Sequence, residues 1–308
     1  MDKNERRARR LLVIFNPTAG SRKRRRLTRW LARLEALGAT VTLVETAGPR
    51  HAEAIARASD PVRFDAVAIA GGDGTINEAV NGLRRGAPPL AIVPLGTANV
   101  LALEIGVNGD AHIIADTIAR GMPVPIHCGR INGRRFLMMA GVGFDAHVVE
   151  RVTPPLKRRL GRSAYILRTV TEAIGYRGPW YRLTVDGSTL ECASAVIDKG
   201  HFYGGKFVCA PDARLDMPEF QTCLFGRGGG WQALRYGAAL AAGRLQSLRD
   251  IKLVSGKRIV IDGPEGEPVQ ADGDIVARLP AVIDVAPDKL PILVPNLADR
   301  PSIYPARC

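Results

Sequence analysis

The sequence has few cysteines and few histidines, and neither is arranged to build a cross-link or a metal site. Its five cysteines are scattered, odd in number and never spaced as C-x-x-C. Neither a disulfide framework nor a cysteine zinc site is therefore predicted. The five histidines form no metal-ligand pattern, so we expect them on the surface or as satisfied core side chains.

Long apolar runs are also missing. No stretch approaches the ~18 apolar residues that a membrane-spanning helix needs. The apolar piece nearest the basic N-terminus, residues 11–15, stops at Asn16-Pro17 and is shorter than the apolar region of a signal peptide. We therefore expect a cytoplasmic globular protein. Its 308 residues leave room for two domains with a substantial core.

Acidic residues are outnumbered, with 30 Asp and Glu against 43 Lys and Arg, so the net charge is +13. This excess implies an anionic partner, which could be a nucleotide, a nucleic acid or a lipid surface. Basic residues cluster at 1–10, 22–26 and 157–162, where each cluster alone could be an ordinary solvated face. Aromatic residues make up 6%, and no nucleic-acid-binding motif accompanies the charge, so no nucleic-acid partner is expected.

The first 120 residues alternate between strand and helix patterns. Strands are predicted at 11–15, 40–45, 66–70 and 90–94, with helices between and after them. Repeated units of this kind predict a mostly parallel sheet covered by helices.

The pattern changes near residue 122. Short strand candidates separated by turns follow, among them 134–140 and 189–197, with helical patterns only at 163–175 and 231–243. We predict an α/β domain over 1–122 and a mainly antiparallel β domain over 123–308, which ends in a Pro-rich surface tail.

The stretch AVAIAGGDGTINEAVNGL, residues 66–83, contains the main candidates for binding a phosphate ligand. A glycine-rich turn from a strand into a helix presents free N–H groups and the positive end of a helix dipole, which suit phosphate. A turn alone has no need of Asp73, whereas a magnesium nucleotide does. Thr75 and Glu78 are spaced as a capping box, which predicts a helix start and also fits a tight turn without a ligand.

Two further polar turns, 16–20 and 95–99, follow the first and fourth predicted strands. Carboxyl ends of parallel strands meet at one edge, so we expect all three turns there. No G-x-x-x-x-G-K-[ST] motif is present. The G-x-G-x-x-A at 141–146 lies in the β-rich half and is a weak dinucleotide signal.

NPTAG, GGDGTINEAVNG and PLGTANVLA, in this order and spacing, resemble the diacylglycerol kinase catalytic domain in its bacterial soluble form. Sphingosine kinases and, more remotely, NAD kinases are related. GVGFDA, APDARLD and VQADGD resemble the second-domain motifs of the same family. The resemblance implies an N-terminal α/β nucleotide-binding domain of the NAD kinase and diacylglycerol kinase type. A C-terminal β-sandwich-like domain follows it, and ATP with Mg²⁺ binds in the cleft between the two.

The same resemblance implies the site residues. Those that would line the ATP site are Asn16, Pro17, Thr18, Ala19, Gly20, Thr46, Gly71, Gly72, Asp73, Gly74, Thr75, Ile76, Asn77, Glu78, Thr97 and Asn99. Asp73 would act on the phosphates, directly or through Mg²⁺. Asp272 or Asp274 would be the general base. The family usually has Asp-Gly-Glu there, and because Asp274 replaces the Glu, both remain candidates. A simple β-turn at Asp272-Gly273 is the alternative.

A structural Mg²⁺ site is less well supported. Family members often carry Asp-Asp-Gly where this chain has Asp216-Met217-Pro218. Methionine is a poor ligand for a hard cation, so the site is predicted to be weak or absent, with Asp216 as its one candidate ligand.

The resulting prediction is an ATP-dependent lipid kinase that associates peripherally with an anionic membrane. It would transfer the γ-phosphate to the hydroxyl of a diacylglycerol-like or sphingosine-like acceptor. An NAD kinase-like enzyme and a non-catalytic nucleotide-binding relative remain alternatives. Residues 156–180 and 201–207 are predicted to line the acceptor site, and the identity of the lipid and the oligomeric state stay open.

Overall fold

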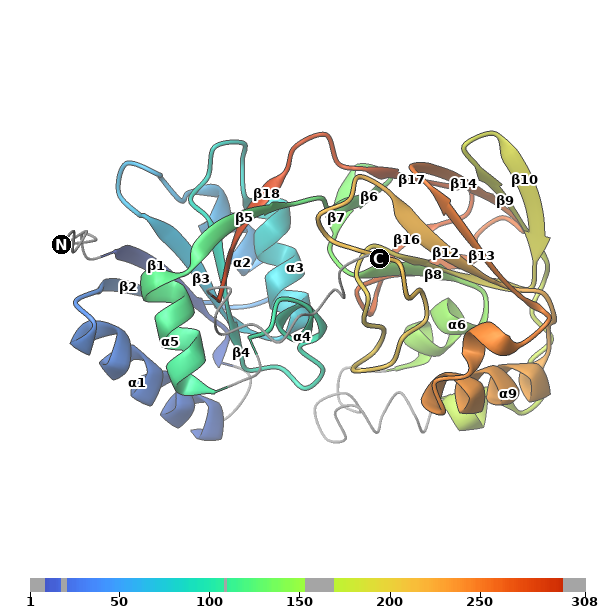
Figure 1. Cartoon of the computed structure of the whole chain (residues 1–308), viewed down its shortest axis with the longest axis horizontal. Coiled ribbons are helices and arrows are strands. Elements are labelled where there is room, and N and C mark those ends of the chain that lie inside the picture. The colour runs from blue at the N-terminus through green and yellow to red at the C-terminus, as the bar shows by residue number, and fades with distance from the viewer. Residues whose placement is uncertain (1–8, 18–20, 108–109, 153–168, 296–308) are drawn as a thin grey trace, which may run out of the picture. The chain divides into compact units, whose positions relative to one another are not determined.

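The chain divides into two compact units in the computed structural model, which describes residues 9–17, 21–107, 110–152 and 169–295. The first unit comprises Met1–Ile126 with Asp288–Cys308, and the second comprises His127–Pro287 (Figure 1). The predicted division at residue 122 is close to this, but the second domain does not run to residue 308. The chain returns to the first unit instead.

The first unit is built on a six-stranded sheet of order β2-β1-β3-β4-β18-β5. Its strands are β1 (Arg10–Phe15), β2 (Thr40–Glu45), β3 (Ala66–Gly71), β4 (Leu90–Pro94), β5 (Met122–Ile126) and β18 (Leu290–Val294). Its helices are α1 (Ser21–Ala36), α2 (His51–Arg57), α3 (Asp73–Gly82), α4 (Val100–Glu104) and α5 (Ala111–Arg120). The strands β1 to β4 are parallel, while β18 pairs antiparallel with β5. The predicted parallel sheet is confirmed.

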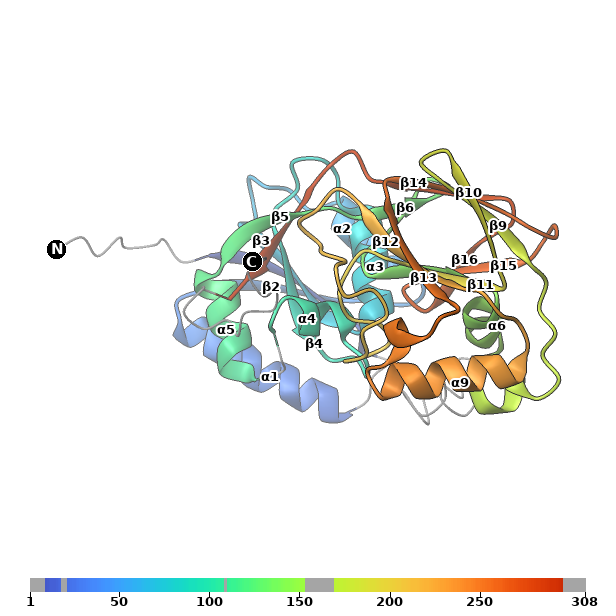
Figure 2. The same cartoon turned by 45° about the vertical axis from the view of Figure 1, so that its right-hand side comes forward.

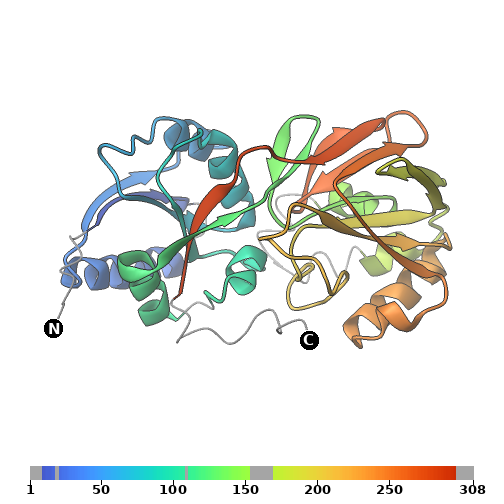
Figure 3. The same ribbon diagram turned by 45° about the horizontal axis from the view of Figure 1, so that its top comes forward.

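Burial explains why these segments form strands and helices. Every residue of β3 and β4 is buried, which is typical of parallel strands covered on both faces (Figure 3). In α1 the buried residues Leu27, Trp30 and Leu34 recur every three or four positions. This helix packs beside α5, whereas α2 packs beside α3. Gly38, with φ of 85°, follows the end of α1 as predicted.

The second unit contains two antiparallel six-stranded sheets, of order β10-β9-β14-β17-β6-β7 and β13-β12-β11-β8-β15-β16. The strands of the first are β6 (Gly129–Ile131), β7 (Arg134–Phe136), β9 (Tyr181–Val185), β10 (Ser188–Cys192), β14 (Arg258–Asp262) and β17 (Ala281–Val285). Those of the second are β8 (Met139–Val142), β11 (Ser194–Asp198), β12 (Phe220–Phe225), β13 (Ile251–Gly256), β15 (Pro268–Ala271) and β16 (Asp274–Arg278). Its helices include α6 (Phe144–Arg151), α9 (Gly230–Ala241) and the short helix η2 (Leu245–Ser247), and residues 169–173 are also helical.

One apolar core lies between the two sheets. It includes Ile131, Leu183 and Ile259 from one sheet and Ala140, Ile197 and Phe220 from the other. This is the expected β-sandwich. Two stretches predicted as single strands, 134–140 and 189–197, each split into two strands that belong to different sheets, because the chain turns a corner there.

Candidate functional site

Three strands of the first unit end side by side. The strands β1, β3 and β4 are parallel neighbours whose last residues are Phe15, Gly71 and Pro94. The prediction that the three polar turns share one edge of the sheet is therefore confirmed. The turn after β2 joins them, because the N–H of Thr46 donates to the carbonyl of Phe15 at 2.8 Å.

Glycine is needed at this edge for close approach. A Cβ on Gly96 would lie 2.5 Å from the Cα of Gly72, so the turns after β3 and β4 touch backbone to backbone. A Cβ on Gly71 would lie 2.7 Å from the Cβ of Thr75. Gly72 has φ of −98°, so its role is to leave space rather than to adopt a left-handed backbone.

The carboxylate of Asp73 joins two of these turns. Its Oδ2 accepts the N–H of Asn99 at 2.9 Å, and its Oδ1 accepts the N–H of Val100 at 2.9 Å. Asn99, with φ of 49°, is the N-cap of α4, so Asp73 caps that helix from the neighbouring turn. The expectation that a turn has no need of this carboxylate is wrong. The role of Asp73 at phosphates stays a prediction.

Helix α3 begins earlier than the capping box predicts. Gly72 is its N-cap, without a side-chain hydrogen bond, and Asp73 is its first residue. Thr75 is buried, and its Oγ1 accepts a hydrogen bond of 2.9 Å from Nδ2 of Asn16. The predicted cap at Thr75 and Glu78 is therefore wrong. Thr75 instead ties the turn after β1 to the turn after β3.

The other residues predicted to line the nucleotide site differ in their exposure, and some of them lie outside the described part of the chain. Thr18, Ala19 and Gly20 lie outside the described residues. Pro17 is half-buried and Thr97 is exposed, whereas Ile76 is fully buried in the core, so only its backbone can meet a ligand.

Two asparagines of this set differ in their surroundings. Asn77 is buried, and its side-chain oxygen accepts a hydrogen bond from Asn81 at 3.1 Å. Asn99 donates through Nδ2 to the carbonyl of Gly96 at 3.0 Å. Its Oδ1 is buried without a hydrogen-bond partner among the described residues. Such an acceptor fits an N–H or O–H donor of a nucleotide.

In the second unit Asp272 occupies the turn between β15 and β16 with φ of 49°. Its carboxylate accepts the N–H groups of Leu137 at 2.7 Å, Met138 at 2.9 Å and Met139 at 3.2 Å. These N–H groups lie at the corner where the chain leaves β7 for β8. The backbone therefore fixes the orientation of Asp272. Asp274 begins β16 and its side chain is exposed.

A buried polar network supports the same turn, and the sequence reasoning missed it. Gln270 accepts the N–H of Gly273 at 3.0 Å and donates to Asp145 at 2.7 Å. The hydroxyl of Tyr203 donates to the other oxygen of Asp145. Burial raises the pKa of Asp145, although both hydrogen bonds oppose the shift. The motifs GVGFDA and VQADGD contained the signal, but they do not show which residues pair.

The G-x-G-x-x-A motif at residues 141–146 is not part of a dinucleotide-binding βαβ unit in this structure. Gly143, with φ of 88°, leads from β8 into α6, and β8 is antiparallel to both of its neighbours. The parallel βαβ unit that such a site requires is not formed there.

The residues that could hold a structural Mg²⁺ do not fit one. Both oxygens of Asp216 accept hydrogen bonds from Arg214, at 2.9 and 2.8 Å. The guanidinium of Arg214 lowers the pKa of Asp216 below its usual value. The carbonyls of Arg214 and Met217 accept hydrogen bonds of 2.5 and 2.7 Å from Nζ of Lys199. Asp216 is thus an ion-pair partner of Arg214 in this structure, and its assignment as a metal ligand stays a prediction.

No group of three or more His, Cys, Asp or Glu side chains in the described part of the chain could hold a metal ion. Within the same residues no helix is both long enough and apolar enough to cross a membrane.

Substituting Asp73 tests its capping role. Because two backbone N–H groups lose their acceptor, we expect Asp73→Ala to lower the free energy of unfolding by about 2 kcal/mol. Urea unfolding measures this. Asp110→Ala is the matched control, since Asp110 caps α5 through one bond to His112 and should cost about 1 kcal/mol. An equal or smaller cost for Asp73→Ala would contradict the capping role.

Known proteins match both units. Residues 10–131 match the model of the diacylglycerol kinase catalytic domain, and residues 138–294 match that of the YegS C-terminal NAD kinase beta sandwich-like domain. The Bacillus subtilis (strain 168) diacylglycerol kinase is 28% identical over 274 residues, covering 87% of this chain and 90% of that protein. The Mycobacterium tuberculosis (strain H37Rv) diacylglycerol kinase is 29% identical over 275 residues, covering 86% and 88%.

Solved structures show the same fold. A diacylglycerol kinase structure from Bacillus anthracis has a TM-score of 0.78 at 24% identity, covering 96% of this chain and 98% of that one. Yeast NADH kinase, solved with NADH, has a TM-score of 0.52 at 12% identity, covering 97% and 87%. These likenesses concern the fold alone. Because the second family model spans half of the sequence, the chain belongs to the kinase family that joins a diacylglycerol kinase catalytic domain to a YegS-type NAD kinase β-sandwich-like domain.

Proposed function

We propose that this protein is an ATP-dependent lipid kinase that transfers the γ-phosphoryl group to the hydroxyl of a diacylglycerol-like lipid at the cytoplasmic face of a membrane. One observation carries the proposal. The turns after β1, β3 and β4 meet at one edge and are tied together by Asn16–Thr75 and Asp73–Asn99 hydrogen bonds. Such an edge is rigid before any nucleotide arrives.

The phosphate end of the reaction is assigned to the first unit. The first N–H groups of α3 follow Gly72 and have no partner within the helix, so they are available to phosphate oxygens. Asn99 Oδ1 offers an acceptor to the nucleotide. Mg²⁺ bound with ATP would supply neutralisation of phosphate charge, which is the main requirement of phosphoryl transfer. The residues of this chain fix the position of the nucleotide.

The acceptor end is assigned to the second unit. Asp272 is the proposed general base, which takes the proton from the attacking lipid hydroxyl. Its three backbone hydrogen bonds hold the carboxylate in one orientation, as a base must be held. Asp274 is the second candidate, and its side chain is exposed.

Transfer of labelled γ-phosphate tests the proposal. The whole chain would be incubated with Mg-ATP and mixed micelles of diacylglycerol or sphingosine, with NAD in a separate reaction. Label in a chloroform-soluble product is the expected result, and its mobility names the acceptor. Label in NAD would replace the proposal with an NAD kinase. ATP binding without label in any product would indicate a non-catalytic relative.

A further inference from the structure

Large apolar side chains are exposed where two segments of the second unit meet. Val170, in the helical residues 169–173, is 49% exposed, and Ile174, in the turn that follows them, is 82% exposed. Trp231, in the first turn of α9, is 76% exposed. Large apolar side chains gathered in one exposed place mark an interaction surface, in contrast to single scattered ones.

The contacts between the two segments hold these side chains together. The N–H of Gly230 donates to the carbonyl of Tyr176 at 3.1 Å. A Cβ on Gly230 would lie 1.5 Å from the carbonyl oxygen of Ala173, so the backbones are in direct contact. Figure 2 shows the helical residues 169–173 beside α9. Ile174 and Trp231 each follow a residue of this contact, so their exposed side chains start from neighbouring backbone positions.

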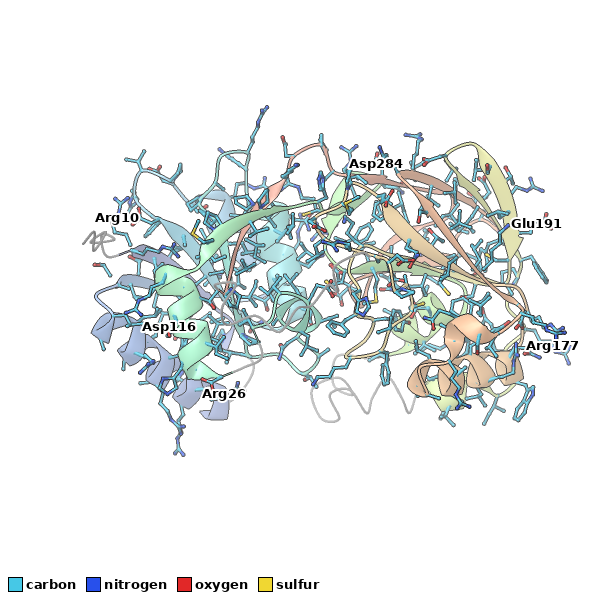
Figure 4. All side chains as sticks on the ribbon, viewed as in Figure 1. Arg10, Arg26, Asp116, Arg177, Glu191 and Asp284 are labelled. Atoms are coloured by element: carbon cyan, nitrogen blue, oxygen red, sulfur yellow. The ribbon has the colours of Figure 1, made fainter. Side chains whose placement is uncertain are left out.

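Two arginines with exposed side chains belong to the same part of the unit. Arg177 is exposed and points outward from the unit (Figure 4), and the side chain of Arg227 is 67% exposed, with its Nε 3.7 Å from Oδ2 of Asp250. The acidic residues nearby are engaged and largely buried. Glu172 pairs with Arg151 at 3.1 Å, and Asp250 accepts hydrogen bonds from Arg235 and Tyr236.

We propose that this docking face, formed by Val170, Ile174, Arg177, Arg227 and Trp231, binds the surface of an anionic lipid bilayer. The inference rests on the proposed function, because a kinase of a bilayer lipid has to reach that bilayer. Tryptophan is suited to the boundary between headgroups and acyl chains, and arginines at its side are attracted to anionic headgroups. The net charge of +13 acts in the same direction.

Vesicle sedimentation without ATP tests the docking face. The full chain would be mixed with vesicles of phosphatidylcholine alone or with phosphatidylglycerol. We expect binding to the anionic vesicles, weakened about tenfold or more by Trp231→Ala. Arg177→Gln should weaken it about fivefold on anionic vesicles alone. Val62→Ala, at a 77% exposed residue of the first unit, is the matched control and should bind as wild type.

Tryptophan fluorescence tests whether the side chain of Trp231 enters the bilayer. In a Trp180→Phe variant only buried Trp30 and exposed Trp231 remain, so quenching by brominated lipids reports Trp231. Quenching supports the proposal. Wild-type vesicle binding by Trp231→Ala would overturn it. Self-association that Trp231→Ala abolishes, without vesicle binding, would overturn it in favour of an interface between two copies.

A second assay separates this inference from the proposed function. With a short-chain, water-soluble diacylglycerol, Trp231→Ala should keep the wild-type kcat and lose activity only on vesicles. Loss of kcat on the soluble lipid would contradict a docking role. Vesicle binding that depends on Trp231, in a protein that phosphorylates no lipid, would support the docking face and contradict the proposed function.

Discussion

Asp272→Asn is expected to lower kcat for lipid phosphorylation by about 10²–10⁴-fold, the usual contribution of a general base. The amide cannot take the proton of the lipid hydroxyl, whereas it keeps the size and nearly the shape of the carboxylate. KM for ATP should stay near its wild-type value, because the turns proposed to bind the phosphates belong to the other unit. Initial rates at saturating lipid and varied ATP measure both constants.

The structure also predicts a stability cost for this variant, which has to be measured beside the rate. An amide presents one acceptor oxygen where Asp272 uses two, so one or two of its backbone donors lose their partner. Each unsatisfied donor costs about 1–3 kcal/mol. Urea unfolding gives this cost, and rates are then compared at a temperature where the variant is folded.

Asp274→Asn is the control for the choice between the two carboxylates. Its side chain is exposed at the start of β16, so the substitution should change stability little. If Asp272 is the base, Asp274→Asn keeps kcat within a few-fold of wild type. A large loss for Asp274→Asn, with Asp272→Asn folded and active, would assign the base to Asp274.

The arrangement of the first unit could be predicted because local signals agreed there. Continuous apolar runs indicated buried parallel strands, and the alternation with helices implied one shared edge for the turns. The return of β18 to that sheet could not be predicted. A strand of five residues at the far end of the chain carries no local sign of its partners, which here are β4 and β5.

The backbone hydrogen bonds of Asp73 and Asp272 could not be predicted from the sequence. Both positions were identified by motif and assigned to chemistry with the ligand. In the structure both carboxylates also bind backbone N–H groups, at the start of α4 and at the β7–β8 corner. Those donors come from residues 27 and 135 positions away, so spacing along the chain could not reveal them. A motif can therefore mark the residues that shape a site as well as those that react.

Lys199→Met is expected to lower the free energy of unfolding by about 3 kcal/mol or more. The side chain of Lys199 is fully buried, and Nζ donates to the carbonyls of Arg214 and Met217. Methionine fills a similar volume without a donor, so both carbonyls lose their partner. Each buried carbonyl left without its donor costs about 1–3 kcal/mol. The midpoint of urea unfolding measures the loss.

The control for this substitution is Lys206→Met, a lysine of the same unit with an exposed side chain, which should shift the midpoint little. Urea unfolding of the wild-type protein in the presence of EDTA tests whether a bound metal ion stabilises the loop of residues 214–217. Because Lys199 supplies the donor to these carbonyls and Asp216 is paired with Arg214, a chelator should leave the wild-type midpoint unchanged. A midpoint that falls in EDTA, or a Lys199→Met variant as stable as Lys206→Met, would contradict this. An unchanged midpoint in EDTA, with a large loss for Lys199→Met, would show that the ammonium of Lys199 rather than a divalent cation holds the loop of residues 214–217.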